Sequence, residues 1–262
     1  MTLAEFAKVV REVKPYTKDV TLHVMGEPLL HPLFPEIVGV LEENSLPLFL
    51  ITNGILIDKH SDTLLNSSIV KQINFSVHSF FANFPNGDVS VYLNKISEFS
   101  RNFINKNPQA FVNFRLWNLP DVKMKMDSTN LRIYRELANI FANPNLPTEV
   151  DVRQQKSYRL ERHIKLHFDS QFEWPSLNSS LSQLDGVCFG IRKQLAILSD
   201  GTVVPCCLDK EAAIALGSLF DKSLSEILEG ERARRFVQGF AKNIAIESLC
   251  QRCQYKNRTS LS

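Results

Sequence analysis

Apolar and polar residues follow two different periods in the N-terminal part of the chain. From Leu3 to Val13 the apolar residues recur at the spacing of one helix face, and Thr2 and Glu5 have the pattern of a capping box. Residues 19–26 (DVTLHVMG) then alternate between apolar and polar side chains, as a half-buried strand does. The sequence therefore predicts an opening helix followed by a strand.

The same two periods repeat through residues 32–152. Further strands are predicted at 46–52, 71–79, 110–118 and 147–152. Further helices are predicted at 32–43, from 58 onward, at 89–105 and at 130–142. Strands that alternate with helices indicate parallel βα units, so the predicted fold class is α/β.

A polar stretch at residues 169–186 (DSQFEWPSLNSSLSQLDG) interrupts this alternation. The chain of 262 residues is long enough for one large domain and a small appendage. We therefore expect a main domain at residues 1–170 and a small C-terminal module at residues 185–262.

Composition excludes several classes of partner. The net charge of +2 gives no reason to expect nucleic acid. The N-terminal segment lacks the long apolar core of a signal peptide, and no apolar run approaches the length of a membrane span. A cytoplasmic location without a membrane partner is therefore expected, and the cysteines are not expected to form disulfides there.

Polar groups follow the predicted strands at corresponding positions. In chain order they are Gly26-Glu27-Pro28, Thr52-Asn53-Gly54, Ser76 with His78, and Arg115 with Trp117. Ligands of parallel α/β folds bind at these strand ends. Arg115 is costly to bury without an anionic partner, and a ligand carboxylate bound through two hydrogen bonds would be one. The alternative is an arginine that reaches water or a neighbouring aspartate.

Cysteines are confined to the predicted C-terminal module, at Cys188, Cys206, Cys207, Cys250 and Cys253. The last two form a Cys-x-x-Cys pair, which lets two thiolates of one turn reach the same metal centre. Residues 199–207 (SDGTVVPCC) predict a hairpin with its turn at Asp200-Gly201, and this hairpin would bring Cys206 to that centre.

Two questions about this thiol set stay open. Four thiolates suffice for one 4Fe–4S cluster, but they also suit a structural zinc ion. Cys207 is either a spare thiol or the ligand in place of Cys206. The predicted ligands are Cys188, Cys206, Cys250 and Cys253.

A capping box from Ser223 to Glu226 predicts a helix that packs behind the site with Leu224, Ile227, Leu228 and Phe236.

Three motifs together resemble the radical S-adenosylmethionine (SAM) superfamily, and the resemblance covers most of the chain. They are MGEPLLHP (25–32), TNG (52–54) and SVHS (76–79), each placed after a predicted strand. The resemblance implies an incomplete (β/α) barrel. It also implies that the Gly-Glu-Pro turn binds the amino group of SAM, although the family usually has glycine where Met25 stands. The implied SAM-binding residues are Met25, Gly26, Glu27, Pro28, Asn53, Ser76 and Arg115. Without the resemblance, Glu27 is a residue near a helix N-terminus that interacts with the helix dipole.

The C-terminal cysteine pattern, with ALGSLFDKSLSEIL at 215–228, resembles the SPASM or twitch extension of radical SAM enzymes. This implies one auxiliary 4Fe–4S cluster, because the middle cysteines of a full SPASM module are lacking. Enzymes of this group cleave SAM reductively and abstract hydrogen from a substrate. A peptide or protein substrate and an electron donor are the implied partners.

The Cys-x-x-x-Cys-x-x-Cys loop that defines the family is not in this sequence, because no cysteine precedes Cys188. We expect this loop, its catalytic 4Fe–4S cluster and the first barrel strand in an upstream segment, since the rest of the SAM site is present and residues 19–26 would otherwise form an unprotected sheet edge. The alternatives are a SAM-binding or scaffold protein without radical chemistry, and a zinc-stapled interaction domain.

The pair His163 and His167 alternates with apolar residues, which indicates a strand and not a metal-binding helix.

Overall fold

The computed structural model describes residues 1–257, apart from residues 121–122, 126–127, 144–145, 148, 172 and 183. The chain forms two compact units. The sheet unit comprises residues 18–23 and 27–171, and the cysteine unit comprises residues 1–17, 24–26 and 172–262. No helix of the described residues has both the length and the apolar character needed to cross a lipid bilayer.

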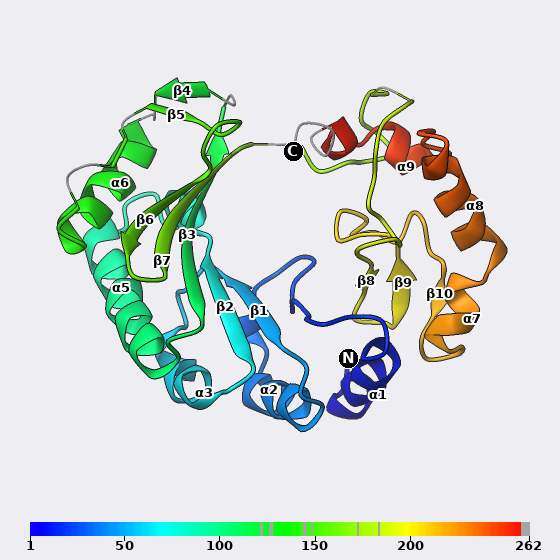
Figure 1. Cartoon of the computed structure of the whole chain (residues 1–262), viewed down its shortest axis with the longest axis horizontal. Helices are drawn as coiled ribbons and strands as arrows, with labels where there is room; N and C mark the ends of the chain where they lie inside the picture. The colour runs from blue at the N-terminus through cyan, green and yellow to red at the C-terminus, as the bar shows by residue number, and fades with distance from the viewer. Residues whose placement is uncertain are drawn as a thin grey trace. The chain divides into compact units, whose positions relative to one another are not determined.

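The sheet unit is built on a five-stranded sheet with the order β1-β2-β3-β7-β6 (Figure 1). Four of its strands are parallel to one another: β1 (Leu48–Thr52), β2 (Val70–Phe75), β3 (Phe111–Leu119) and β7 (Ile164–Ser170). The fifth strand, β6 (Ser157–Glu161), is antiparallel to β7. This confirms the predicted α/β class and the parallel arrangement of the strands at 46–52, 71–79 and 110–118.

Helices cover one face of this sheet (Figure 1). They are α2 (Phe34–Glu43), α3 (Ser61–Asn66), α5 (Val89–Lys106) and α6 (Ser128–Ile140). Alternate residues of β3, such as Phe114 and Leu116, are fully buried, whereas Asn113, Arg115 and Trp117 between them are only half-buried. Because side chains of a strand alternate between faces, the polar and aromatic residues lie on the face opposite the buried one. Short elements complete the unit: η1 (Pro28–Leu30), η2 (Asp58–His60), η3 (Val77–Ser79), α4 (Phe80–Asn83), β4 (Lys123–Lys125) and β5 (Glu149–Asp151).

The predicted strand at 19–26 is wrong except for one residue. Val20 forms a single bridge to β1, with its N–H donating to the oxygen of Pro47 and its oxygen accepting from the N–H of Phe49, both at 2.9 Å. Leu22 and Val24 are half-buried and belong to no strand. A period of two identifies residues that can pair, but the partner strand decides whether they do, and here the pairing with β1 ends after one residue.

Two other predicted elements differ from the structure. The strand expected near 147–152 is β5, which pairs antiparallel with β4 in a separate two-stranded sheet. The fourth parallel strand is β7, which begins directly after His163. Its residues alternate between buried and half-buried, as the apolar and polar residues of this segment do in the sequence. The end of the strand expected at 71–79 is the single turn η3, because the extended backbone ends at Phe75.

The cysteine unit combines a small sheet with short helices. Its strands β8 (Ala196–Ile197), β9 (Thr202–Val204) and β10 (Gly217–Ser218) are antiparallel. The predicted turn at Asp200-Gly201 joins β8 to β9, and Gly201 has φ +81°, a conformation that favours glycine. Its helices are α1 (Leu3–Val13), α7 (Leu224–Leu228), α8 (Glu231–Ala241), α9 (Ser248–Gln251) and η4 (Tyr255–Asn257).

The opening helix α1 has its predicted capping box and contacts the C-terminal segment. Lys8 donates to the oxygen of Phe220 at 3.1 Å, and Glu12 accepts from the N–H of Leu224, the first residue of α7, at 2.9 Å. The contact with Glu12 gives a partner to an N–H group that has none inside α7, because the first N–H groups of a helix lack intrahelical acceptors. The division into domains at 1–170 and 185–262 stays a prediction, and the contacts of α1 lie within the cysteine unit.

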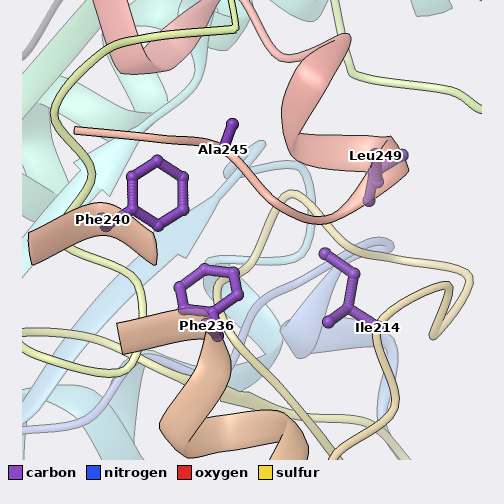
Figure 2. Close-up of a cluster of buried hydrophobic side chains, with 5 residues drawn as sticks. All are labelled: Ile214, Phe236, Phe240, Ala245 and Leu249. Carbon is purple, nitrogen blue, oxygen red and sulfur yellow. The ribbon is translucent and has the colours of Figure 1, made fainter. Parts of the chain in front are cut away.

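The predicted capping box of Ser223 and Glu226 is confirmed, but the helix behind the cysteines is two helices. Glu229 ends α7, and Gly230 has extended backbone as the N-cap of α8. The predicted continuous helix to Phe236 is therefore wrong. Phe236 still packs within this unit, because α8 carries it into the hydrophobic cluster that Figure 2 shows.

Candidate functional site

Glu27 is fixed by donors from its own turn and from the end of β1. Its Oε1 accepts hydrogen bonds from the N–H of Leu29 at 3.1 Å and from the hydroxyl of Thr52 at 2.6 Å, and its Oε2 accepts from the N–H of Asn53 at 2.6 Å. A carboxylate offers about four acceptor positions. Glu27 is half-buried and uses three of them in these contacts, which leaves one for a further donor.

The turn after β1 is held in one conformation. The side-chain oxygen of Asn53 accepts from the N–H of Ile55 at 2.9 Å, and its backbone oxygen accepts from the hydroxyl of Tyr92 at 2.7 Å. Burial and the nearby charge of Glu27 raise the pKa of Tyr92, so its hydroxyl stays protonated and donates. Gly54 has φ +74°, and a Cβ there would lie 2.8 Å from Phe75, so this position requires glycine.

The register of the sheet brings the predicted polar residues to one row. Thr52 pairs with Phe75, Phe75 with Phe114, and Phe114 with Leu166. The next residues along these four strands lie one step closer to the carboxyl edge, and they are Asn53, Ser76, Arg115 and His167. The N–H of Ser76 also donates to the oxygen of Thr52 at 2.8 Å. The structure therefore brings together Glu27, Asn53, Ser76 and Arg115 at one edge of the sheet.

The other predicted residues of the turn have different environments. Pro28 begins η1 directly after Glu27. Met25 is exposed, and Gly26 has φ +92° with open space where a Cβ would stand. Met25 and Gly26 are grouped with the cysteine unit, and Gly26 fits its left-handed backbone because it has no side chain.

Arg115 has an aromatic partner and no carboxylate partner among the described residues. Its guanidinium stacks over the ring of Trp117 at 4.1 Å from the centroid, and burial lowers its pKa to about 10. Asp169, the carboxylate residue of β7, forms an ion pair with Lys156 at 3.1 Å. A desolvated guanidinium with free donors is a binding site for a carboxylate or another planar anion.

Trp117 was predicted beside Arg115 at the strand end, but its partner His167 was not predicted as part of this site. The indole Nε1 of Trp117 donates to Nδ1 of His167 at 2.8 Å, which requires an unprotonated Nδ1. Burial, followed by the charge of Arg115, lowers the pKa of His167 to about 4, so the ring is neutral at pH 7. A strand-to-strand contact of this kind leaves a weak signal in sequence, namely polar residues at alternate positions of two strands.

The depressed pKa of His167 predicts a loss of stability in acid. A histidine that is neutral in the folded state and has an ordinary pKa of 6.5 when unfolded stabilises the fold fully above pH 6.5 and progressively less as the pH falls toward about 4. We expect the thermal midpoint of the protein to fall across this range and His167→Asn, which retains an acceptor, to reduce the fall. Thermal unfolding at several pH values measures this, with His163→Asn as the control. Equal slopes for the protein and His167→Asn would contradict the assignment.

The predicted cysteine ligands line one pocket in the cysteine unit. Its empty space amounts to about 480 Å³, with open solvent at the mouth included, and its lining includes Cys188, Cys206, Cys250 and Cys253. The rings of Phe236 and Phe240 in the same lining lie with their centroids 5.0 Å apart in the buried cluster of Figure 2. Two of the cysteines, Cys188 and Cys250, pack against this cluster. Cys207 is half-buried and is not among the described residues that line the pocket.

Electrostatic coupling places these four thiols near one another. Burial, followed by the charges of neighbouring cysteines, raises the pKa of Cys206 to about 12 and also raises the pKa of Cys250. The neighbours that act on Cys250 are Cys188, Cys206 and Cys253. Cys188, Cys206 and Cys250, whose pKa values burial raises, are therefore protonated at pH 7, and binding of a cationic metal centre would have to release their protons.

The four thiols that line the pocket are the candidate ligands of a metal centre. Among the described residues, no group of three or more histidine, cysteine, aspartate or glutamate side chains is arranged to hold a single metal ion. A zinc ion needs its ligands around one point, whereas in a 4Fe–4S cluster each thiolate binds a different iron.

Two buried charged residues border the same pocket, and no sequence motif indicated either of them. Asp209 is 1% exposed, and its carboxylate accepts from the N–H groups of Ala213 and Ile214 at 2.8 and 2.7 Å. Lys256 is 2% exposed, and its ammonium donates to the oxygens of Cys250 and Cys253 at 3.1 and 2.9 Å. Burial lowers the pKa of Lys256, while the charges of Cys253 and Cys250 act in the opposite direction.

Comparison with known families identifies the cysteine-rich segment. Residues 188–254 match the family model SPASM, described as an iron–sulfur cluster-binding domain. The matched segment begins at Cys188 and ends after Cys253, so it contains all five cysteines. No curated protein matches the sequence.

Comparison with solved structures supports the fold of the whole chain. BtrN in complex with AdoMet and 2-DOIA has a TM-score of 0.53 and 15% identity, covering 97% of this chain and 80% of BtrN. Streptococcus suis SuiB bound to the precursor peptide SuiA has a TM-score of 0.56 and 13% identity, covering 96% of this chain and 64% of SuiB. Hexahistidine-tagged anSMEcpe with bound AdoMet has a TM-score of 0.50 and 16% identity, covering 98% of this chain and 82% of anSMEcpe. Residues 188–254 therefore match the SPASM family of iron–sulfur cluster-binding domains, and the fold of the chain as a whole is similar to that of a radical SAM partial barrel followed by such a domain.

Proposed function

We propose that the cysteine unit holds one 4Fe–4S cluster and that the sheet unit binds SAM. The observation that carries the first part is the shared pocket of Cys188, Cys206, Cys250 and Cys253 within the SPASM segment. When bound, such a cluster supplies one-electron chemistry at a potential that the protein tunes. The chain's own contribution is the set of four thiols, which lose their protons on binding, and the hydrophobic cluster behind them that limits water access.

The row of polar residues at the sheet edge supports the SAM site. Glu27 has one acceptor position left for the ammonium of SAM, and the guanidinium of Arg115 has free donors for the carboxylate. Asn53 and Ser76 lie between them in the same row and offer polar contacts to the rest of the cofactor. The backbone of Met25, Gly26 and Pro28 completes the proposed site, because the sequence places these residues directly beside Glu27.

The reaction class that fits these two sites is reductive cleavage of SAM followed by abstraction of hydrogen from a substrate. SuiB, one of the proteins with this fold, was crystallised with its precursor peptide SuiA, which supports a peptide or protein substrate. The half-buried polar face of the sheet around Arg115 and Trp117 is where we place that substrate. An electron donor is required by the reaction class.

One observation favours a second function, a SAM-binding protein without radical chemistry. No cysteine occurs among residues 1–187, so the proposed catalytic 4Fe–4S cluster needs thiolates from outside these 262 residues. An in-frame upstream sequence that encodes Cys-x-x-x-Cys-x-x-Cys would support the enzyme. In-frame stop codons directly upstream would support the SAM-binding protein.

Metal analysis of anaerobically reconstituted protein tests the cluster. We expect about four irons and four sulfides per chain, together with the visible absorption of thiolate-bound iron. About one zinc per chain without visible absorption would replace the cluster with a structural zinc site. That second result would leave the SAM proposal to be tested separately by calorimetry.

Arg115→Ala is expected to weaken SAM binding about 10- to 100-fold, because hydrogen bonds to charged groups contribute about 1.5–3 kcal/mol. Isothermal titration calorimetry with SAM measures the change. Arg159→Ala is the control, since Arg159 is an exposed arginine on β6 of the same sheet. An unchanged affinity in Arg115→Ala would remove Arg115 from the SAM site and leave Glu27 as its remaining charged contact.

A further inference from the structure

Lys256 is an unusual feature of the cysteine pocket because it is both charged and almost completely buried. Lysine is rarely buried to 2% exposure unless a partner compensates its charge. Its ammonium lies within hydrogen-bond distance of two ligand residues, donating to the oxygen of Cys250 at 3.1 Å and to that of Cys253 at 2.9 Å. Both acceptors belong to the Cys-x-x-Cys turn.

These two hydrogen bonds give Lys256 a defined place in the ligand loop. The N–H of Cys253 donates to the oxygen of Cys250 at 3.2 Å, which closes the turn, and Lys256 joins the two carbonyl groups from outside it. The orientation of the two thiols depends on the backbone of this turn. A residue that holds the turn therefore positions two of the proposed iron ligands.

The charge of Lys256 has a second consequence. Four thiolates around a 4Fe–4S core give a net negative centre, and reduction adds one more negative charge to it. A cation held in a buried place beside the ligands stabilises the reduced state more than the oxidised state, because Coulomb interactions are stronger away from water. The negative charge of Asp209 in the same pocket favours the oxidised state of the cluster instead. Its oxygens already accept hydrogen bonds from two backbone N–H groups.

We propose that Lys256 is a positioning residue for the cluster, which fixes the Cys250–Cys253 turn through its two carbonyl contacts and raises the reduction potential of the cluster through its charge. The proposal rests on the proposed function, because it requires the cluster. It assigns to Lys256 a role that the ligand set itself does not reveal.

Three substitutions separate the charge of Lys256 from its hydrogen bonds. Lys256→Arg retains both, Lys256→Gln retains donors and removes the charge, and Lys256→Met removes both. The exposed Lys222, which is outside the residues that line the pocket, supplies the control Lys222→Met. For each protein, iron and sulfide content are measured after anaerobic reconstitution, and the reduction potential is measured by a redox titration followed by electron paramagnetic resonance.

We expect Lys256→Gln and Lys256→Met to have more negative potentials than the unsubstituted protein, and Lys256→Arg and Lys222→Met to have potentials close to it. Lys256→Met is expected to retain iron less firmly, by about tenfold or more in affinity, as for other residues that orient metal ligands. An unchanged potential in Lys256→Gln with full iron content would overturn the role of the charge. Full iron content and an unchanged potential in Lys256→Met would overturn the proposal as a whole.

The two failures are distinguishable. If the unsubstituted protein binds no iron and sulfide, the proposed cluster fails, and the Lys256 proposal fails with it. If the unsubstituted protein carries the cluster and the Lys256 variants match it in iron content and potential, only the proposal about Lys256 fails.

Discussion

Cys250→Ala is expected to remove most of the iron and sulfide from anaerobically reconstituted protein. Cys250 lines the pocket, packs half-buried against the cluster of Phe236 and Leu249, and is coupled electrostatically to the other three proposed ligands. A 4Fe–4S cluster that loses one of four thiolates leaves one iron without its protein ligand. Iron and sulfide determination, together with visible absorption, measures the loss.

Cys207→Ala is the matched control, because Cys207 is a half-buried cysteine of the same segment outside the described pocket lining. We expect it to retain full iron content, and Cys206→Ala to behave like Cys250→Ala. The reverse result, with iron lost from Cys207→Ala and retained by Cys206→Ala, would exchange the two ligands. Full iron content in Cys250→Ala would contradict the proposed ligand set.

Glu27→Ala is expected to destabilise the sheet unit by about 3 kcal/mol and to abolish measurable SAM binding. The substitution removes the acceptor from the N–H groups of Leu29 and Asn53 and from the hydroxyl of Thr52, and hydrogen bonds to a charged group contribute about 1.5–3 kcal/mol each before the freed donors bind water. The ammonium of SAM would lose its carboxylate at the same time. Urea denaturation measures the first effect and calorimetry the second.

The exposed Glu43 at the end of α2 gives the control Glu43→Ala, for which neither quantity is expected to change. Glu27→Gln is informative as an intermediate, because an amide oxygen still accepts from these donors but carries no charge. We expect it to retain most of the stability and to lose most of the SAM affinity. If Glu27→Gln binds SAM as tightly as the unsubstituted protein, Glu27 has only a structural role.

Local signals in the sequence predicted the elements whose causes are local. The capping boxes at Thr2 and Ser223 and the turn at Gly201 each depend on residues within a few positions, and the structure confirms all three. The strand predicted at 19–26 and the sheet predicted for the strand near 147–152 were wrong for the opposite reason. Whether Val20 continues into a strand, and which sheet β5 joins, depends on partners distant in sequence.

The candidate site follows the same division. Cys-x-x-Cys spacing and the Gly-Glu-Pro motif indicate ligands because each packs several reactive groups into a few residues. Other residues of the site act through contacts between separate elements. These contacts join Lys256 to Cys253, Tyr92 to Asn53, and His167 to Trp117. The spacing of residues within a single segment does not indicate such a contact. The roles of these residues could therefore be assigned only from the structure.

The contact between Glu12 and Leu224 has a consequence for the order of events during synthesis. Its two residues are 212 positions apart, and a ribosome adds about 5–20 residues per second, so the partner of α1 emerges about 10–40 s after α1 itself. During that interval α1 lacks its contacts with the backbone of Phe220 and Leu224. Helix α1 therefore reaches its final surroundings only after residues 220–224 have been synthesised.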